Sequence, residues 1–282
     1  MLGKQERYQI IDQFITDLPP QPPADGILVV DKPSGPTSHD LVYAVRRKYG
    51  IKKIGHTGTL DPLASGLMIL LIGSATKRAS EFSGLDKAYQ VKAKLGQITD
   101  SFDIEGQILF DIFNRESTLA NDIPIRKSLE VNWDDLKNSE ELGSLTDKTI
   151  EQALEDFRSQ LNQRVPPFSA VKLNGKPLYK YAREGKPIPF ERLPTRDIVI
   201  HEIKLLDFKP HDKNRNNGYD EIHSSVISDP LSGAEIQPAV YGSPNTGLYP
   251  TLSLRISCSK GTYIRSIAVS YTHLTLPTKR IV

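Results

Sequence analysis

The chain has 282 residues, of which 38% are hydrophobic, and a formal net charge of +2. This length can bury one large core or two smaller ones. The first residues lack the basic start and long apolar run of a signal peptide, and no apolar run could cross a bilayer, so we expect a cytoplasmic protein. Cys258 is the only cysteine, which excludes an internal disulfide and a cysteine-based zinc site within one chain.

Proline punctuates the first part of the chain. Residues 1–25 end in a segment, Pro19 to Pro23, that cannot continue a helix, so we interpret them as an N-terminal extension. The apolar run Ile27–Val30 before a turn cluster predicts a buried strand. A helix should follow, with Ser38 as its N-cap and Gly50 as its left-handed C-terminal residue.

Short apolar or alternating runs predict the later strands. Leu67–Ile72 is typical of a buried strand or of the start of a helix. Tyr89–Leu95 alternates apolar with polar residues, as a half-buried strand does. Ile198–Phe208 and Leu252–Cys258 are expected to be further strands, the latter followed by a segment of helical character, residues 262–268.

One amphipathic helix is expected in the middle of the chain. Thr149 and Gln152 have the spacing of a capping box. Apolar residues then repeat at helical spacing from Ile150 to Leu161, and Pro166 would prevent the helix from continuing further. Helices and strands without a regular repeat indicate an α+β fold.

Two polar, weakly periodic stretches resemble insertions. We expect residues 111–148 and 210–250 to form long surface loops, and Trp133 to anchor the first of them.

Basic residues concentrate in the first third of the chain. Five of them lie within eight positions: Arg46, Arg47, Lys48, Lys52 and Lys53. Such a cluster is either a solvated helix end that complements the helix dipole or a track for RNA phosphates.

The chemistry of the chain concentrates in the segment Gly55–Gly66, GHTGTLDPLASG. Its three glycines permit close approach of the backbone to a ligand, and Asp61, which precedes a proline, is held outside the α region. Taken alone the motif is ambiguous, because an Asp before Pro is also common in turns and helix caps.

GHTGTLDPLASG resembles the signature of the bacterial tRNA pseudouridine(55) synthases (TruB type). Further blocks resemble that family in the same order: DKPSGPTSHD before the signature, then GSATK, KAYQVKAKLGQITDSFDIEG, PPFSAVKLNGKPLYKYAREG and CSKGTYIRSIA. The resemblance implies a catalytic domain over residues 26–268, interrupted by the two insertions. Its fold would be the α+β pseudouridine synthase fold, with a mixed, largely antiparallel central sheet flanked by helices and loops.

The resemblance also implies the reaction, isomerisation of the T-loop uridine of tRNA to pseudouridine after base flipping. Asp61 would be the catalytic nucleophile, without cofactor or metal. Its carboxylate could attack the sugar at C1′, add to the base at C6, or assist loss of the base through a glycal-like intermediate. A glycosidase would need a second carboxylate, and no neighbouring Asp or Glu suggests one.

Two further catalytic residues follow from the resemblance. Tyr89 would lie against the flipped base and handle a proton, although an alternating strand residue of this kind can also simply pack. Arg265 would pair with Asp61 and keep it ionised, although an exposed helix arginine is the alternative.

Three residues are assigned to substrate binding. Tyr263 resembles a residue that contacts the target nucleotide, with a buried structural tyrosine as the alternative. His56, otherwise a satisfied loop histidine or a base, would occupy space vacated by flipped nucleotides. Lys32 belongs to a lysine-proline element that we expect to pack beneath the loop of Asp61.

The last residues depart from the family pattern. Residues 269–282 match no family block, so we interpret them as an anomalous tail that is not native sequence and the domain as truncated. We expect a monomer that binds the T-arm of tRNA, with no membrane and no obligatory protein partner. A noncatalytic RNA-binding or tRNA-folding protein is the other reading, and an enzyme of a guide-RNA particle is disfavoured by the residues after Pro62.

Overall fold

The computed structural model describes residues 4–21, 25–111, 145–155, 157–210, 227–228, 235–236 and 249–268. The chain divides into two compact units, Met1–Asp86 with Ile222–Val240 and Lys87–Glu221 with Tyr241–Val282. Most of the two expected insertions, including Trp133, and the tail 269–282 lie outside the described residues.

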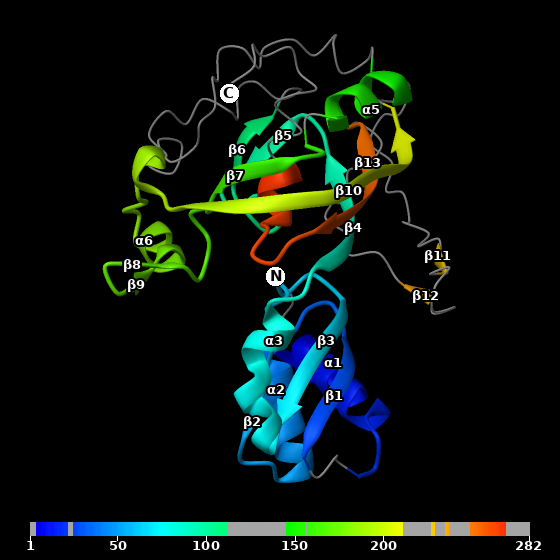
Figure 1. The fold of residues 1–282 in the computed structure, drawn as a ribbon, viewed down its shortest axis with the longest axis vertical. Helices are drawn as coiled ribbons and strands as arrows, with labels where there is room; N and C mark the ends of the chain where they lie inside the picture. Colours follow the sequence, from blue (N-terminus) through cyan, green and yellow to red (C-terminus); the bar gives the residue numbers. More distant parts are fainter. Residues whose placement is uncertain are drawn as a thin grey trace. The chain divides into compact units, whose positions relative to one another are not determined.

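A three-stranded antiparallel sheet forms the first unit (Figure 1). β3 (Gly66–Ile72) lies between β1 (Gly26–Lys32) and β2 (Ile54–His56). β1 pairs with β3 along its whole length, from Gly26 opposite Ile72 to Lys32 opposite Gly66. The run at 67–72 is therefore a strand and not a helix, because both of its edges are paired.

The helix α2 (Ser38–Tyr49) covers one face of this sheet. Its side chains Leu41 and Val45 are fully buried in a core shared with Leu70 of β3. Gly50 ends the helix in the left-handed conformation, φ 66°, as expected.

The expected N-cap of α2 was wrong by one residue. Thr37 caps the helix through a capping box: its hydroxyl accepts a hydrogen bond from Asp40 N, and its own N–H donates to the Asp40 carboxylate. Ser38 is the first helical residue, and its hydroxyl bonds elsewhere.

The N-terminal extension contains a helix, α1 (Lys4–Asp17), that packs on α2. Phe14 and Leu18 belong to the same buried core. Lys48 Nζ of α2 donates to the backbone oxygens of Ile15 and Leu18, at 2.9 Å in the second case, and so caps the end of α1. Lys48 is therefore engaged in the fold, in contrast to the exposed Arg47, Lys52 and Lys53 of the same basic cluster. The unit is completed by η1 (Gly73–Arg78) and α3 (Ala79–Ser83).

A four-stranded antiparallel sheet forms the second unit. Its order is β4 (Lys87–Lys94), β13 (Thr251–Cys258), β10 (Thr195–Lys209) and β7 (Gln160–Arg164). Every second side chain of β13 is buried, as the sequence alternation predicts. These side chains meet α5 (Asp147–Glu155) in one apolar core.

Smaller elements surround this sheet. The hairpin β5 (Gln97–Thr99) and β6 (Ile108–Asp111) lies beside it, and residues 264–268 are helical. A small lobe has its own buried cluster of Val165, Leu178 and Leu193. The lobe consists of β8 (Lys172–Leu173), β9 (Lys176–Pro177), α6 (Leu178–Arg183) and η3 (Phe190–Arg192). The short strands β11 (Ile227–Ser228) and β12 (Glu235–Ile236) pair with each other.

The helix expected to reach Leu161 was too long. α5 ends at Glu155, and the residues from Gln160 onward form β7, which pairs with β10. Leu161 lies opposite Ile198 in that pairing, so the apolar residue that fits helical spacing is used by a sheet. Tertiary pairing here overrides local periodicity.

The expected α+β class is confirmed, because antiparallel sheets and helices share each core. All strand pairs among the described residues are antiparallel, in two main sheets. None of the helices within these described ranges is long and apolar enough to cross a membrane.

The start of α5 provides a test of the fold. Thr146 Oγ1 accepts from Thr149 N, and Thr149 Oγ1 accepts from Thr146 N, whereas Gln152 is exposed. Thr146→Ala should therefore lower the free energy of unfolding by about 1 kcal/mol, because a helix-capping hydroxyl is removed. Gln152→Ala should change it by less than about 0.5 kcal/mol. Urea denaturation measures both; a larger loss in Gln152→Ala than in Thr146→Ala would indicate the Thr149–Gln152 box instead.

Candidate active site

Asp61 lies in the connection between β2 and β3 of the first unit. Ala64 N donates to Asp61 O at 3.1 Å, which closes a turn with Pro62 at its second position, where proline is favoured. Asp61 is partly exposed, while the next apolar residues, Leu63 and Ala64, are buried. The turn thus presents the partly exposed carboxylate next to residues that anchor the loop in the core.

The backbone around Asp61 is hydrogen-bonded residue by residue. Each carbonyl from Leu60 to Ala64 accepts a hydrogen bond, and apart from that turn the donors come from residues 32–38. Gly35 N donates to Pro62 O at 2.7 Å and Ser34 Oγ to Leu63 O at 2.8 Å. Four residues of the DKPSGPTS segment therefore hold the loop of Asp61 in one conformation: Lys32, Ser34, Gly35 and Ser38.

Lys32 is the centre of this support. Its ammonium donates to Pro33 O at 2.9 Å, to Pro62 O at 2.9 Å and to Ala64 O at 2.7 Å, and the residue is 0% exposed. Burial lowers the pKa of Lys32 to about 8, an effect that the carboxylates of Asp61 and Asp40 oppose. The enclosed ammonium fits the expected packing of Lys32 beneath the loop, and a contact of Lys32 with substrate stays a prediction.

Ser38 holds the residue immediately before Asp61. Its hydroxyl accepts from Leu60 N at 3.0 Å and donates to Leu60 O at 3.0 Å. Ser38 is 2% exposed, so these bonds are shielded from water.

His56 is the last residue of β2, opposite Leu70 of β3. It is partly buried, and its Nδ1 is buried with no hydrogen-bond partner in the described part of the chain. A histidine that relays protons would need a hydrogen-bonded partner to orient its ring. This placement at the start of the loop therefore suits a residue that fills space.

The two candidate tyrosines lie in the second unit. Tyr89 of β4 pairs with Ile256 of β13 and packs partly buried against the sheet core. Tyr263 packs against the cluster of the small lobe, and its peptide groups bond the Gln163 side chain, with Tyr263 N donating at 2.8 Å and Tyr263 O accepting at 3.0 Å. The main chain of both residues is thus held by backbone contacts.

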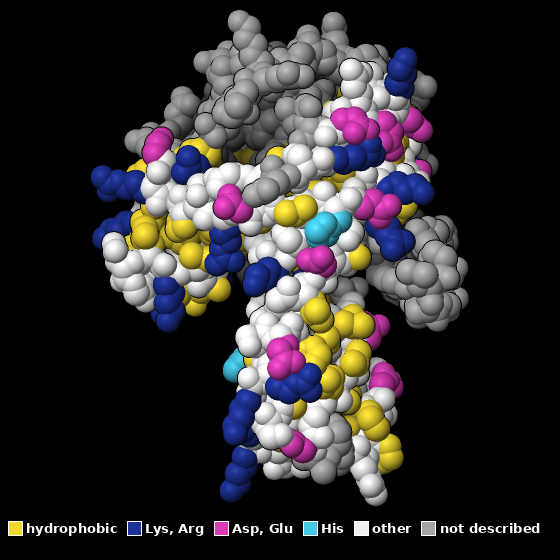
Figure 2. Space-filling view, viewed as in Figure 1, with side chains coloured by type: hydrophobic (Ala, Val, Ile, Leu, Met, Phe, Trp, Pro, Cys, Tyr) yellow, Lys and Arg dark blue, Asp and Glu magenta, His cyan; other side chains and the backbone are white. Residues whose placement is uncertain are grey.

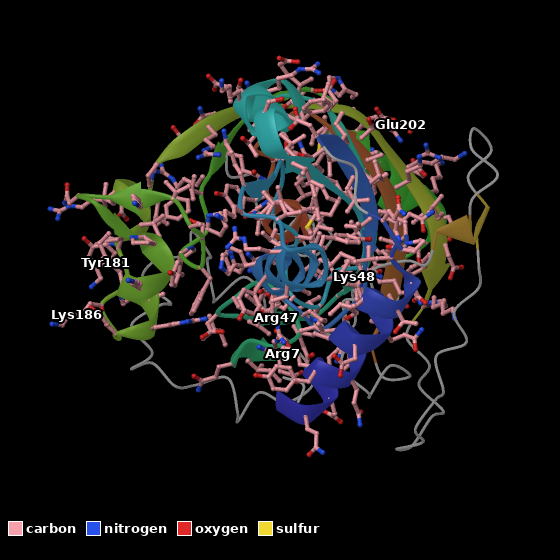
Figure 3. The ribbon with its side chains drawn as sticks, turned by 90° about the horizontal axis from the view of Figure 1, so that it is seen from below. Arg7, Arg47, Lys48, Tyr181, Lys186 and Glu202 are labelled. Atoms are coloured by element: carbon pink, nitrogen blue, oxygen red, sulfur yellow. The ribbon has the colours of Figure 1, made fainter. Side chains whose placement is uncertain are left out.

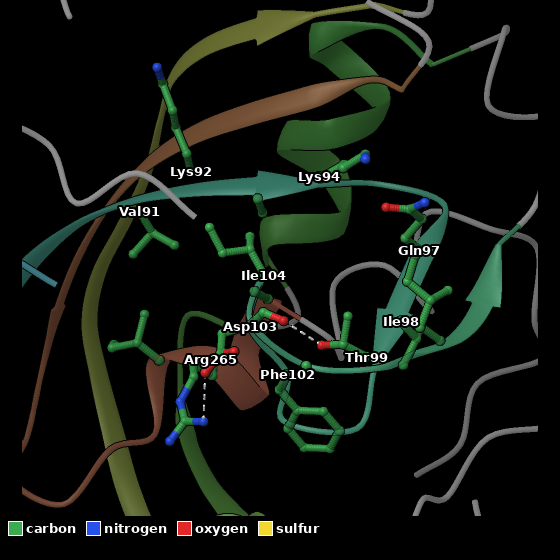
Figure 4. Close-up of a pocket in the computed structure, with 15 residues that line it drawn as sticks. Val91, Lys92, Lys94, Gln97, Ile98, Thr99, Phe102, Asp103, Ile104 and Arg265 are labelled. Atoms are coloured by element: carbon green, nitrogen blue, oxygen red, sulfur yellow. Dashed lines mark hydrogen bonds and ion pairs between the residues drawn. The ribbon is translucent and has the colours of Figure 1, made fainter. Parts of the chain in front are cut away.

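Arg265 donates hydrogen bonds to residues of the second unit, and Figure 4 shows its pairing with Asp103. Its Nη1 donates to Ser101 O at 2.7 Å and to Asp103 Oδ2 at 3.2 Å, and its Nη2 donates to Phe168 O at 3.2 Å. The side chains of Arg265 and Asp103 are 12% and 10% exposed. Arg265 is therefore an ordered, nearly buried cation and not the exposed helix arginine considered as its alternative.

Arg265 also borders a cavity of about 200 Å³ in the second unit. Apolar side chains of β4, β5 and the following turn, among them Val91, Ile98 and Phe102, line the cavity, with Lys94 at its border (Figure 4).

The structure brings the site residues together in two groups. Lys32, His56 and Asp61 lie in the first unit, and Tyr89, Tyr263 and Arg265 in the second. The pairing of Arg265 with Asp61 stays a prediction. The sequence carries no signal for Asp103 or for the loop-holding roles of Ser34 and Ser38, because neither a polar turn with three acids nor a serine beside a helix start singles out one residue.

Basic side chains gather on both units (Figures 2 and 3). On the first unit Arg47, which Figure 3 labels, is exposed, and so are Lys52 and Lys53. On the small lobe of the second, basic side chains stack on aromatic rings: Lys176 lies 4.5 Å from the Tyr181 ring centre, and Arg183 lies 5.3 Å from that of Tyr179.

Comparisons with known proteins point to one family. The family model described as TruB family pseudouridylate synthase (N terminal domain) matches residues 46–130 and 125–217. The tRNA pseudouridine synthase B of Opitutus terrae is 34% identical over 249 residues, which cover 88% of this chain and 74% of the relative. The proteins of that name from Geobacillus kaustophilus and Protochlamydia amoebophila are 34% and 36% identical over 87% and 86% of this chain.

This chain spans 64% and 66% of the latter two relatives' lengths. Among solved structures, the crystal structure of a Cbf5-Nop10-Gar1 complex is similar, with a TM-score of 0.45 and 19% identity over 95% of this chain and 46% of that chain.

Removing the Lys32 ammonium should weaken the loop. Lys32→Met keeps the length of the side chain but leaves three carbonyls without their charged donor, so we expect the free energy of unfolding to fall by about 3 kcal/mol. Ser34→Ala, which removes one exposed partner, should cost less than about 1 kcal/mol. Chemical denaturation compares the two variants, and equal losses would contradict the central role of Lys32.

The lowered pKa of Lys32 predicts a pH dependence. The pKa is about 8 in the folded chain and 10.5 in the unfolded chain, so the unfolded state binds more protons between these values. The burial cost is fully present below pH 8 and is relieved as the pH rises. The free energy of unfolding should therefore rise by about 1 kcal/mol from pH 8 to 9 relative to Lys32→Met. A constant difference between the two proteins would contradict this.

Proposed function

Because this chain belongs to the TruB family of pseudouridylate synthases, we propose that it isomerises a uridine in the T-loop of tRNA to pseudouridine, with Asp61 as nucleophile. The observation that carries this proposal is the loop of Asp61, in which each carbonyl from Leu60 to Ala64 is hydrogen-bonded. A preorganised carboxylate is what covalent catalysis at a sugar or a base requires.

The reaction breaks the bond between C1′ and N1 of uridine, forms a bond between C1′ and C5, releases the proton from C5 and adds a proton to N1. Asp61 can serve at C1′, at C6 or in loss of the base through a glycal-like intermediate. These steps use a carboxylate and proton transfers, so the proposal includes no cofactor and no metal.

Residues of the second unit would handle the base and the charge. Tyr89 would stack on the flipped uracil, a contact worth roughly 1–3 kcal/mol, comparable with the few kcal/mol needed to extrude a nucleotide. Arg265, oriented by Asp103, would pair with Asp61 and keep its carboxylate ionised. Tyr263 would contact the same nucleotide, and His56 would occupy the space left by flipped bases.

Surface chemistry supports RNA as the partner. The exposed cations Arg47, Lys52 and Lys53 suit phosphate, and the basic aromatic lobe suits unpaired bases. We propose recognition of the folded T-arm by its shape, by a cytoplasmic monomer without an obligatory protein partner.

The direct test uses unmodified tRNA with tritium at C5 of uridine. The wild-type chain should release tritium from the T-loop position, and Asp61→Asn should abolish release while tRNA affinity changes by less than about tenfold. Asp31→Asn, which alters an exposed carboxylate of β1, is the matched control and should keep the wild-type rate.

Turnover by Asp61→Asn would overturn the assignment of the nucleophile. Tight binding of tRNA by a wild-type chain that releases no tritium would favour the noncatalytic RNA-binding protein.

Salt dependence tests the phosphate track. Replacing Lys52 and Lys53 by Ala should weaken tRNA binding and reduce the slope of log affinity against log salt by roughly one unit for each phosphate that its lysine no longer neutralises. The control replaces two exposed lysines of the second unit, Lys148 and Lys204. Filter binding at several salt concentrations measures the slopes. An unchanged slope in the first variant would make the cluster a solvated helix end.

A further inference from the structure

The start of α2 divides two tasks between neighbouring residues. Thr37 caps the helix with Asp40, which satisfies the first backbone groups. The hydroxyl of Ser38 is therefore not needed by its own helix. It reaches across 22 positions of sequence to the loop of Asp61.

Ser38 makes hydrogen bonds to both polar backbone groups of one residue of that loop, Leu60. Its Oγ lies 3.0 Å from Leu60 N and 3.0 Å from Leu60 O, as acceptor in the first case and donor in the second. Ser38 is 2% exposed, so water cannot easily replace these bonds. One hydroxyl thus sets the position of both polar backbone groups of Leu60, whose carbonyl belongs to the peptide bond that joins Leu60 to Asp61.

The anchors downstream of Asp61 are different groups. Pro62 O and Ala64 O are held by Lys32, and Leu63 O is held by Ser34. On the upstream side, the next backbone anchor in the described part of the chain is Thr57 N, which donates to Ile69 O. Leu60 is therefore the point at which the upstream half of the loop is fixed, and removal of this anchor would free the peptide of Asp61 on one side.

We infer that Ser38 is a positioning residue for Asp61 and acts through the backbone of Leu60. This inference rests on the proposed function, because the consequence of misplacing Asp61 is a loss of turnover. Displacements near 1 Å are enough to lower a rate up to about a hundredfold. The helix core and the Lys32 contacts do not depend on this hydroxyl, so the fold should survive its removal.

The test compares Ser38→Ala with Thr37→Ala in the full chain. Ser38→Ala should lower kcat for tritium release by about ten- to a hundredfold and leave KM for tRNA within about threefold. Thr37→Ala removes the cap of the same helix and should lower Tm while kcat stays near that of the wild type. A merely structural role of Ser38 would give the two variants the same pattern, and that result would overturn the inference.

Hydrogen exchange supplies a readout that needs no activity. The Leu60 amide should exchange at least about tenfold faster in Ser38→Ala than in the wild type, and at the wild-type rate in Thr37→Ala. Unchanged exchange at Leu60 in Ser38→Ala would overturn the inference even in an active enzyme. If the wild type releases no tritium, the proposed function fails, whereas the exchange of Leu60 still decides whether Ser38 positions the loop.

Discussion

The buried ammonium of Lys32 is the interaction on which the candidate site depends. Taking a charge out of water is costly, and the lowering of the pKa of Lys32 to about 8 reflects that cost. Three backbone carbonyls offset it, two of them from the loop of Asp61. The same contacts that make the charge tolerable therefore fix the loop. Lys32, at the end of β1, thereby fixes the position of the Asp61 carboxylate, which follows β2.

The support of Asp61 is distributed over one short segment. Lys32 ends β1, Gly35 and Ser34 form the turn after it, and Ser38 begins α2, so one passage of the chain supplies donors to successive carbonyls of another. Such a set of bonds leaves the loop few alternatives, which is the preorganisation that nucleophilic catalysis needs. In the second unit Arg265 is prepared in the same way by Asp103 and two carbonyls. Each unit orders its own part of the proposed chemistry.

The elements that sequence predicts best are those in which local pattern and final environment agree. β13 alternates in sequence and in burial, because one face of the strand packs on a single core. α5 shows the opposite case. Its apolar spacing continues to Leu161, yet the chain leaves the helix at Glu155 because the next residues complete the edge of a sheet. The N-cap of α2 was displaced by one residue because Thr37, and not Ser38, has an acidic partner three positions on, Asp40, which completes a capping box and leaves the Ser38 hydroxyl for the loop.

The sequence by itself determined the α+β class and the principal strands, because alternation and turn residues can be read from short stretches of the chain. Its ordered series of motifs also led to the proposal of Asp61 as the nucleophile. It also determined the family, since those motifs carry chemistry that the fold does not change. Only the tertiary structure decided that the Lys32 ammonium binds Pro62 O and Ala64 O, that Arg265 is bound to Asp103, and that Ser38 holds Leu60. The physical reason is that a hydrogen bond between residues far apart in the chain exists only after the strands have brought its donor and acceptor within about 3 Å.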